Sequence, residues 1–121
     1  MDFIEKMFSA LEKNNLWWLN QRMTRHGVLY CPHGLETGQD DSPRFDEGAI
    51  LAVDMNSYLL SQMRATAELA KILGKGSAAE KWTAKADLLA ENMVKVMYDA
   101  EQNMFFDADP ITAERRTLWS A

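Results

Sequence analysis

Acidic side chains gather in one short stretch, residues 36–46, which reads Glu-Thr-Gly-Gln-Asp-Asp-Ser-Pro-Arg-Phe-Asp. It holds four carboxylates, one arginine, and a glycine and a proline that favour turns. A carboxylate placed among other carboxylates is disfavoured as an anion, so its pKa rises and it can carry a proton near neutral pH. Such a group can serve as a general acid. A solvated acidic turn would have the same composition, so composition alone leaves both interpretations open.

The order of these residues resembles the catalytic-acid loop of the six-hairpin glycosidases. The likeness is strongest to glycoside hydrolase family 63, with its processing α-glucosidases and mannosylglycerate hydrolases, and to the related trehalases. There the loop reads Glu-Ser-Gly, a variable residue, the acid Asp, Asn or an aromatic residue, Ser, Pro or Ser, Arg, and Trp or Phe. The resemblance places Asp40 on the acid. A second block, Val-Asp-Met-Asn at 53–56, resembles the Val-Asp-Leu-Asn segment that opens the next barrel helix.

The same resemblance implies roles for the neighbours of the acid. Asp41 and Arg44 are expected to bind sugar hydroxyls or orient the acid, and the backbone of Gly38 and Gln39 is expected to lie close to the substrate. Gln39 and Asp41 stand where the family more often has an aromatic residue and Asn, and Thr37 stands for Ser, so the substrate contacts are expected to differ. Arg44 could instead form a structural salt bridge to one of the acidic residues at 46–47.

Hydrolysis of a glycosidic bond by two carboxyl groups is the chemistry that the resemblance implies. One group protonates the leaving oxygen, and the other activates water on the opposite face; in inverting enzymes the two stand ~6.5–9.5 Å apart. The resemblance implies inversion, an α-glucosidic or α-mannosidic substrate, and no cofactor. No segment matches the motif of the base, and the available glutamates make poor candidates: Glu91, Glu101 and Glu114.

The length of the chain, 121 residues, is too short for a whole barrel of this type. An (α/α)6 barrel needs about twelve helices of roughly 10–14 residues each. We therefore expect an all-α partial domain over residues 1–121, with about three barrel helices and the acid loop at 34–47. The remainder of the barrel would be its partner, and the isolated chain would be inactive. Side chains at the missing contacts are expected to include some of Phe3, Leu11, Trp17, Leu89, Phe105 and Trp119.

Apolar spacing predicts the elements that position the loop. A first helix is expected over 2–25, bent near Asn14-Asn15, with a buried stripe of Phe3, Met7, Leu11, Leu16, Leu19 and Met23. A second should begin near Asp54 as N-cap and stop at Gly74. A third should open on a capping box at 77–80 and end near residue 98, antiparallel to the second because the link is short. Residues 104–106 should be extended after a turn.

Composition argues against several other classes. The net charge of −5 with scattered basic residues argues against nucleic acid, and no apolar run approaches the ~20 residues of a membrane helix. The single Cys31 suits a reducing compartment, so a cytoplasmic location is expected unless a longer parent begins with a signal. His26, Cys31 and His33 are too few for a zinc framework, and the aspartates at 99–109 lack a calcium loop, so no metal is expected.

Two alternatives to an active hydrolase remain open. Three amphipathic helices also describe a helical interaction module, although no repeat of ~34–45 residues recurs. A barrel relative that binds sugar without cleaving it would also have this pattern, since the base is missing.

The pair Trp17-Trp18 is either a sugar-stacking platform or, for at least one of the two, part of the core.

Overall fold

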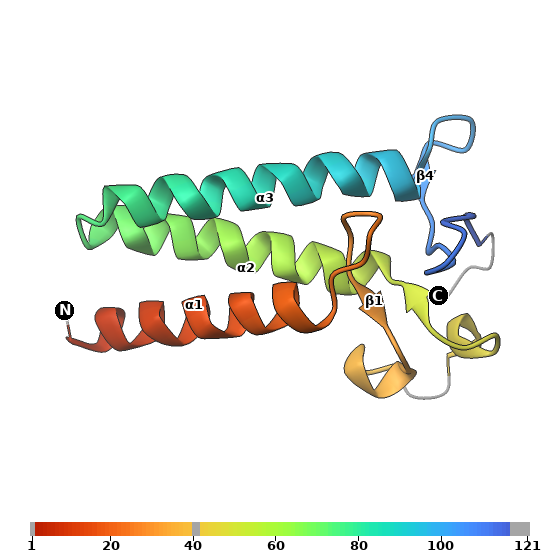
Figure 1. The fold of residues 1–121 in the computed structure, drawn as a ribbon, viewed down its shortest axis with the longest axis horizontal. Helices are drawn as coiled ribbons and strands as arrows, with labels where there is room; N and C mark the ends of the chain where they lie inside the picture. Colours follow the sequence, from red (N-terminus) through yellow and green to blue (C-terminus); the bar gives the residue numbers. More distant parts are fainter. Residues whose placement is uncertain (1, 40–41, 117–121) are drawn as a thin grey trace.

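Three long helices make up more than half of the chain. The computed structural model describes residues 2–39 and 42–116. In these residues α1 (Asp2–Gln21), α2 (Val53–Ile72) and α3 (Gly76–Met97) hold 20, 20 and 22 residues, with strand confined to two-residue pairs. Figure 1 shows the helices side by side, with α2 between α1 and α3. The expected all-α class is confirmed. None of the described helices is long and apolar enough to cross a bilayer.

The pair α2–α3 carries most of the core and matches the expected pattern. Gly74 ends α2 with a φ of 71°, a left-handed conformation that glycine adopts without strain. The chain then turns back, and the Lys75 N–H donates to the Ala70 carbonyl at 2.8 Å. Trp82 of α3 is fully buried against α2, and its indole N–H donates to Glu12 of α1 at 2.8 Å. One buried cluster therefore ties all three helices together.

The first helix differs from the expected one in length, shape and orientation. It ends at Gln21 rather than residue 25, and it is continuous through Asn15. Phe3 and Met7 are exposed, whereas Phe8 and Asn15 are buried. The Asn15 amide donates to Thr66 Oγ1 at 3.0 Å, so a polar residue sits on the buried face of the helix. Apolar spacing misses such a residue. Of the predicted stripe, Leu16 and Met23 are also exposed, whereas Leu19 packs against the core.

The helix starts also differ from the expected caps. Ala52 precedes α2 as its cap residue and Lys75 precedes α3, in both cases without a capping side chain. The predicted N-cap, Asp54, and the predicted capping box at 77–80 were wrong. The Asp54 carboxylate instead binds Arg44. Asp54 thus lies within the first turn of α2, where its carboxylate forms the ion pair and also accepts from the Met55 N–H at 3.0 Å.

Two pairs of short strands lie outside the helices, one between α1 and α2 and one after α3. β1 (Tyr30–Cys31) pairs with β2 (Ile50–Leu51), and the acid loop lies between them with the 3-10 turns η1 (Gly34–Glu36) and η2 (Pro43–Phe45). β3 (Tyr98–Asp99) pairs with β4 (Met104–Phe105), as expected for the segment after α3. Leu51 and Ala108 exchange backbone hydrogen bonds at 2.8 and 3.1 Å. The acid loop and the segment after α3 consequently share one end of the bundle (Figure 1).

Candidate active site

The acid loop is anchored on its first side by an ion pair with the end of α1. Arg22 donates from Nη2 to Glu36 Oε1 at 2.6 Å and from Nε to Glu36 Oε2 at 3.2 Å. Both side chains are less than one-fifth exposed. The guanidinium also lies over the rings of Trp17 and Tyr30, 5.0 and 5.6 Å from their centroids. Paired donors to a carboxylate fix orientation as well as distance, so Glu36 has a defined place at the start of the loop.

Arg44 anchors the second side of the loop and is the most highly bonded side chain of the region. Its Nη1 and Nη2 donate to the two oxygens of Asp54 at 3.0 and 2.8 Å. Its Nε and Nη2 donate to the two oxygens of Asp107 at 2.6 and 2.9 Å. Nη1 also donates to Gln39 Oε1 at 2.8 Å. A guanidinium has five N–H donors, and each has an acceptor in the described part of the chain.

Burial and charge act in opposite directions on these groups. Arg44 is 7% exposed, a costly place for a charge without partners. Hydrogen bonding to Asp54 raises the pKa of Arg44, outweighing the effect of burial, and Asp107 adds to the rise. Partial burial alone would raise the pKa of Asp54, but the hydrogen bond and charge of Arg44 lower it overall. Both shifts favour the charged forms of Arg44 and Asp54, and the guanidinium lies between the carboxyl groups of Asp54 and Asp107.

Asn56, in the second sequence block, fixes the backbone before β1. Its Nδ2 donates to the carbonyls of Leu29 and Ala52 at 3.0 and 2.7 Å, and its Oδ1 accepts from the Leu29 N–H at 2.7 Å. The side chain is fully buried. With Asp54 holding Arg44, the 53–56 block binds both the loop and the chain that leads into it.

The predicted substrate-contact residues are placed as follows. Gly38 is exposed, has a φ of 76°, and has open space where a Cβ would stand. Gln39 is exposed, and its backbone N–H donates to the Gly34 carbonyl at 3.3 Å while its side chain accepts from Arg44. Asp40 and Asp41 lie outside the described residues. The structure thus brings Gln39 and Arg44 together, one residue before the predicted acid and four after it.

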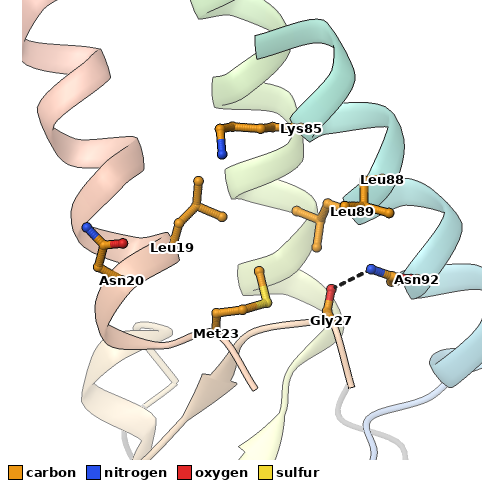
Figure 2. A pocket seen from close by; sticks show the side chains of 8 residues that line it. All are labelled: Leu19, Asn20, Met23, Gly27, Lys85, Leu88, Leu89 and Asn92. Carbon is orange, nitrogen blue, oxygen red and sulfur yellow. Dashed lines mark hydrogen bonds between the residues drawn. The ribbon is translucent and has the colours of Figure 1, made fainter. Parts of the chain in front are cut away.

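A cleft opens beside the Arg44 cluster. It has a volume of about 410 Å³ and is lined by charged and polar groups of η2 and the C-terminal segment: Pro43, Arg44, Asp46, Glu47, Asp107, Arg115 and Arg116. A second cleft, of about 360 Å³, lies between the end of α1 and α3 and is mostly apolar. Figure 2 shows its side chains, with Asn92 donating to the Gly27 carbonyl at 3.1 Å. Of these two clefts, the first has the more polar lining and adjoins Arg44 and Asp107.

The sequence matches the model of one protein family over nearly its whole length. Residues 1–118 match the mannosylglycerate hydrolase MGH1-like glycoside hydrolase domain. The chain belongs to this glycoside hydrolase family. No curated protein and no solved structure matches it. The match covers both sequence blocks, and the helical fold is that of an all-α part of a glycosidase barrel.

Three residues of this glycoside hydrolase domain hold the acid loop, or the chain that leads into it, through contacts that the sequence did not predict. Asp54 and Asn56 were recognised within a motif, but their bonds to Arg44 and Leu29 were not foreseen. Asp107 had no sequence signal, because its partner lies 63 positions away. The predicted alternative partners of Arg44, at 46–47, were wrong. Its described salt bridges go to Asp54 and Asp107.

The remaining candidate residues fall outside this cluster. Trp18 packs against the core, which confirms the core role for one member of the tryptophan pair, whereas Trp17 is 46% exposed. Cys31 is fully buried, and burial raises its pKa to about 12. Among residues 2–39 and 42–116 no group of three His, Cys, Asp or Glu side chains is arranged to hold a metal. His26 contacts the Ile111 carbonyl at 3.2 Å.

Proposed function

We propose that the chain is the acid-bearing part of an inverting glycoside hydrolase that cleaves α-glucosidic or α-mannosidic bonds. The observation that carries this proposal is the family match over residues 1–118, which spans both the acid loop and the 53–56 block. It favours a hydrolase over a helical interaction module. The anchored ends of the loop, at Glu36 and Arg44, support it further, since general acid catalysis requires a fixed geometry.

Asp40 is the proposed general acid. It would protonate the glycosidic oxygen as the bond to the anomeric carbon breaks, while water attacks that carbon from the opposite face and gives up a proton to a carboxylate base. The candidate glutamates of this chain, Glu91, Glu101 and Glu114, are all exposed. We therefore place the base in another part of the full-length barrel, and we expect the 121-residue chain alone to be inactive.

The proposed substrate contacts divide between direct and indirect ones. The Gly38 backbone has open space around it, and Gln39 and Asp41 flank the acid in sequence, so these three are the proposed sugar contacts. Arg44 was a candidate for the same role by resemblance. Because each of its five donors already has a protein acceptor, orienting the loop is the role that its geometry favours.

Exchange of Asp40 for Asn in the full-length protein tests the acid. Asp40→Asn keeps the shape but removes the transferable proton, so kcat on an α-linked disaccharide should fall by about 10²- to 10⁴-fold. The loss should be smaller for an aryl glycoside, because a good leaving group needs little protonation. Binding should persist. Steady-state kinetics on both substrates measure the difference.

Asp41→Asn is the matched control for this exchange. It restores the residue that is commoner in the family and should leave most of the activity. Wild-type turnover by Asp40→Asn on the disaccharide would overturn the assignment of the acid, as would loss of activity in Asp41→Asn alone. Wild-type protein that binds the sugar without any hydrolysis would identify an inactive barrel relative.

A further inference from the structure

Among the described residues, Asp107 is the side chain of the segment after α3 that hydrogen-bonds to the acid loop. Both of its carboxylate oxygens accept from Arg44, and Oδ1 also accepts from the Val53 N–H at 3.0 Å. Val53 is the first residue of α2. Asp107 is only 10% exposed, so these bonds are shielded from water. One carboxylate thus holds the start of a helix and the end of the loop in fixed relation.

The Arg44 cluster needs this second carboxylate. Asp54 satisfies one edge of the guanidinium, and Asp107 satisfies the Nε edge. Without Asp107 the Nε–H and one Nη2–H would lose their acceptors inside the protein, and an unsatisfied buried donor is costly. The expected response is rotation of Arg44 toward water. That rotation would break its bond to Gln39, the residue that precedes the predicted acid.

We propose that Asp107 is a positioning residue for glycoside hydrolysis, acting through Arg44 and its bond to Gln39 on the residues on either side of the predicted acid. Its two carboxylate oxygens are already occupied by Arg44 and the Val53 N–H. The catalytic part of this role rests on the function proposed above, whereas the structural part, immobilising residues 34–39 and 42–47, does not. The segment that follows α3, remote in sequence, is accordingly part of the apparatus that sets the loop.

The test compares Asp107→Asn with Asp109→Asn in the full-length protein. Both exchanges remove one carboxylate charge from the same segment. Asp109 bonds within its own turn and to Arg116 at 3.0 Å, so its exchange leaves the Arg44 cluster intact. A misplacement of about 1 Å can cost on the order of 10²-fold in rate. We expect Asp107→Asn to lower kcat on the disaccharide by up to about that factor, with KM little changed. Asp109→Asn should leave both kcat and KM unchanged.

Two further readouts separate positioning from general loss of structure. A misplaced acid penalises the disaccharide more than an aryl glycoside, whereas partial unfolding lowers both rates equally. Hydrogen exchange of the loop amides, including the bonds from Gln39 to Gly34 and from Gly48 to Phe45, should be faster in Asp107→Asn only. Asp107→Glu should recover part of the disaccharide activity because it restores the charge.

The outcomes distinguish this role from the proposed function itself. Unchanged loop exchange and kcat in Asp107→Asn would overturn the positioning role while the Asp40→Asn result stands. Equal losses on both substrates would overturn it as well. Conversely, full activity of Asp40→Asn would refute the proposed acid. Faster loop exchange in Asp107→Asn would still show that Asp107 immobilises the loop.

Discussion

At the scale of single residues, Arg44 illustrates how a charge is held inside a small domain. Its cost of burial is offset by hydrogen bonds to the carboxyl groups of Asp54 and Asp107 and to an amide oxygen of Gln39. Removing one member of a buried pair usually costs more than the pair contributes, because the remaining charges lose their partner. The carboxylates of Asp54 and Asp107 depend on Arg44 in this way.

Truncation of Arg44 should therefore be strongly destabilising. We expect Arg44→Ala to lower the free energy of unfolding by about 3–5 kcal/mol, the usual cost of breaking a buried ion pair. Arg44→Lys should retain part of that stability but not the geometry, since an ammonium cannot span two carboxylates with paired donors. Urea unfolding of the variants measures both. An Arg44→Ala protein as stable as the wild type would contradict the arrangement.

The lowered pKa of Asp54 gives a pH dependence with a definite sign. A carboxylate with a lower pKa in the folded state contributes stability that is fully present above its ordinary value of 3.8, and that stability is lost as pH falls through the folded pKa. Acidification below about pH 4 should thus weaken the wild type more than Asp54→Asn. Unfolding curves at pH 5 and pH 3 test it; parallel losses in the two proteins would refute it.

At the scale of elements, the turn after α1 is held by a close contact between two segments. Gly27 has a φ of 77°, and a Cβ added to it would stand 2.3 Å from Asn92 Nδ2. Gly74 has a similar φ of 71° but open space around it. A side chain added at Gly74 would therefore meet backbone strain alone, whereas one added at Gly27 would also clash with Asn92.

Alanine substitution at both glycines exploits this difference. Gly74→Ala should cost about 1–2 kcal/mol from the left-handed backbone alone. Gly27→Ala should cost more, because the Asn92 side chain must also move and give up its bond to the Gly27 carbonyl. Adding Asn92→Ala to Gly27→Ala should relieve the steric part. Equal destabilisation by the two single exchanges, measured by thermal unfolding, would contradict this picture.

The paired strands at the base of the loop should protect Cys31. Because burial raises the pKa of its thiol to about 12, almost no thiolate is present at pH 8. A thiol reagent should react with the native protein far more slowly than with the urea-unfolded chain. Rapid native labelling would show that β1 and β2 separate readily.

The sequence predicted the positions of the helices better than the side-chain contacts between them. The positions of α2 and α3, their antiparallel pairing and the turn at Gly74 followed from apolar spacing and short-range signals. The buried face of α1 did not, since Asn15 and Glu12 lie there through bonds to other helices. Side-chain partners across long separations have no local signature. The Asp107 bond to Arg44 belongs to this class.

At the scale of the whole molecule, large apolar side chains remain at the surface. Phe3, Trp17 and Phe105, three of the six residues among which exposed ones were expected, are exposed. Leu11 is half-buried, Leu89 is buried, and Trp119 lies outside the described residues. Phe3 is 73% exposed on the outer side of α1. In a glycosidase barrel such side chains would contact neighbouring helical hairpins.

The isolated chain should accordingly associate in solution. Contiguous apolar surface beyond a few hundred Å² favours self-association. We expect sedimentation velocity to show oligomers whose fraction grows with concentration, and Phe3→Ser with Trp17→Ser to reduce them. Exchange of the exposed Lys6 for Ser, also on α1, is the control. A monodisperse monomer at all concentrations would contradict the expectation.

The pairing of Leu51 with Ala108 also imposes an order of events during synthesis. The chain is made from its N-terminus, so the acid loop and α2 exist before the residues that complete their base. Contacts between distant residues form late in folding, because the intervening chain must first be ordered. Until Asp107 has been made, the acceptors of Arg44 within the described residues are Asp54 and Gln39. The loop that carries the proposed acid thus acquires its full set of bonds only after the chain has been made as far as Asp107.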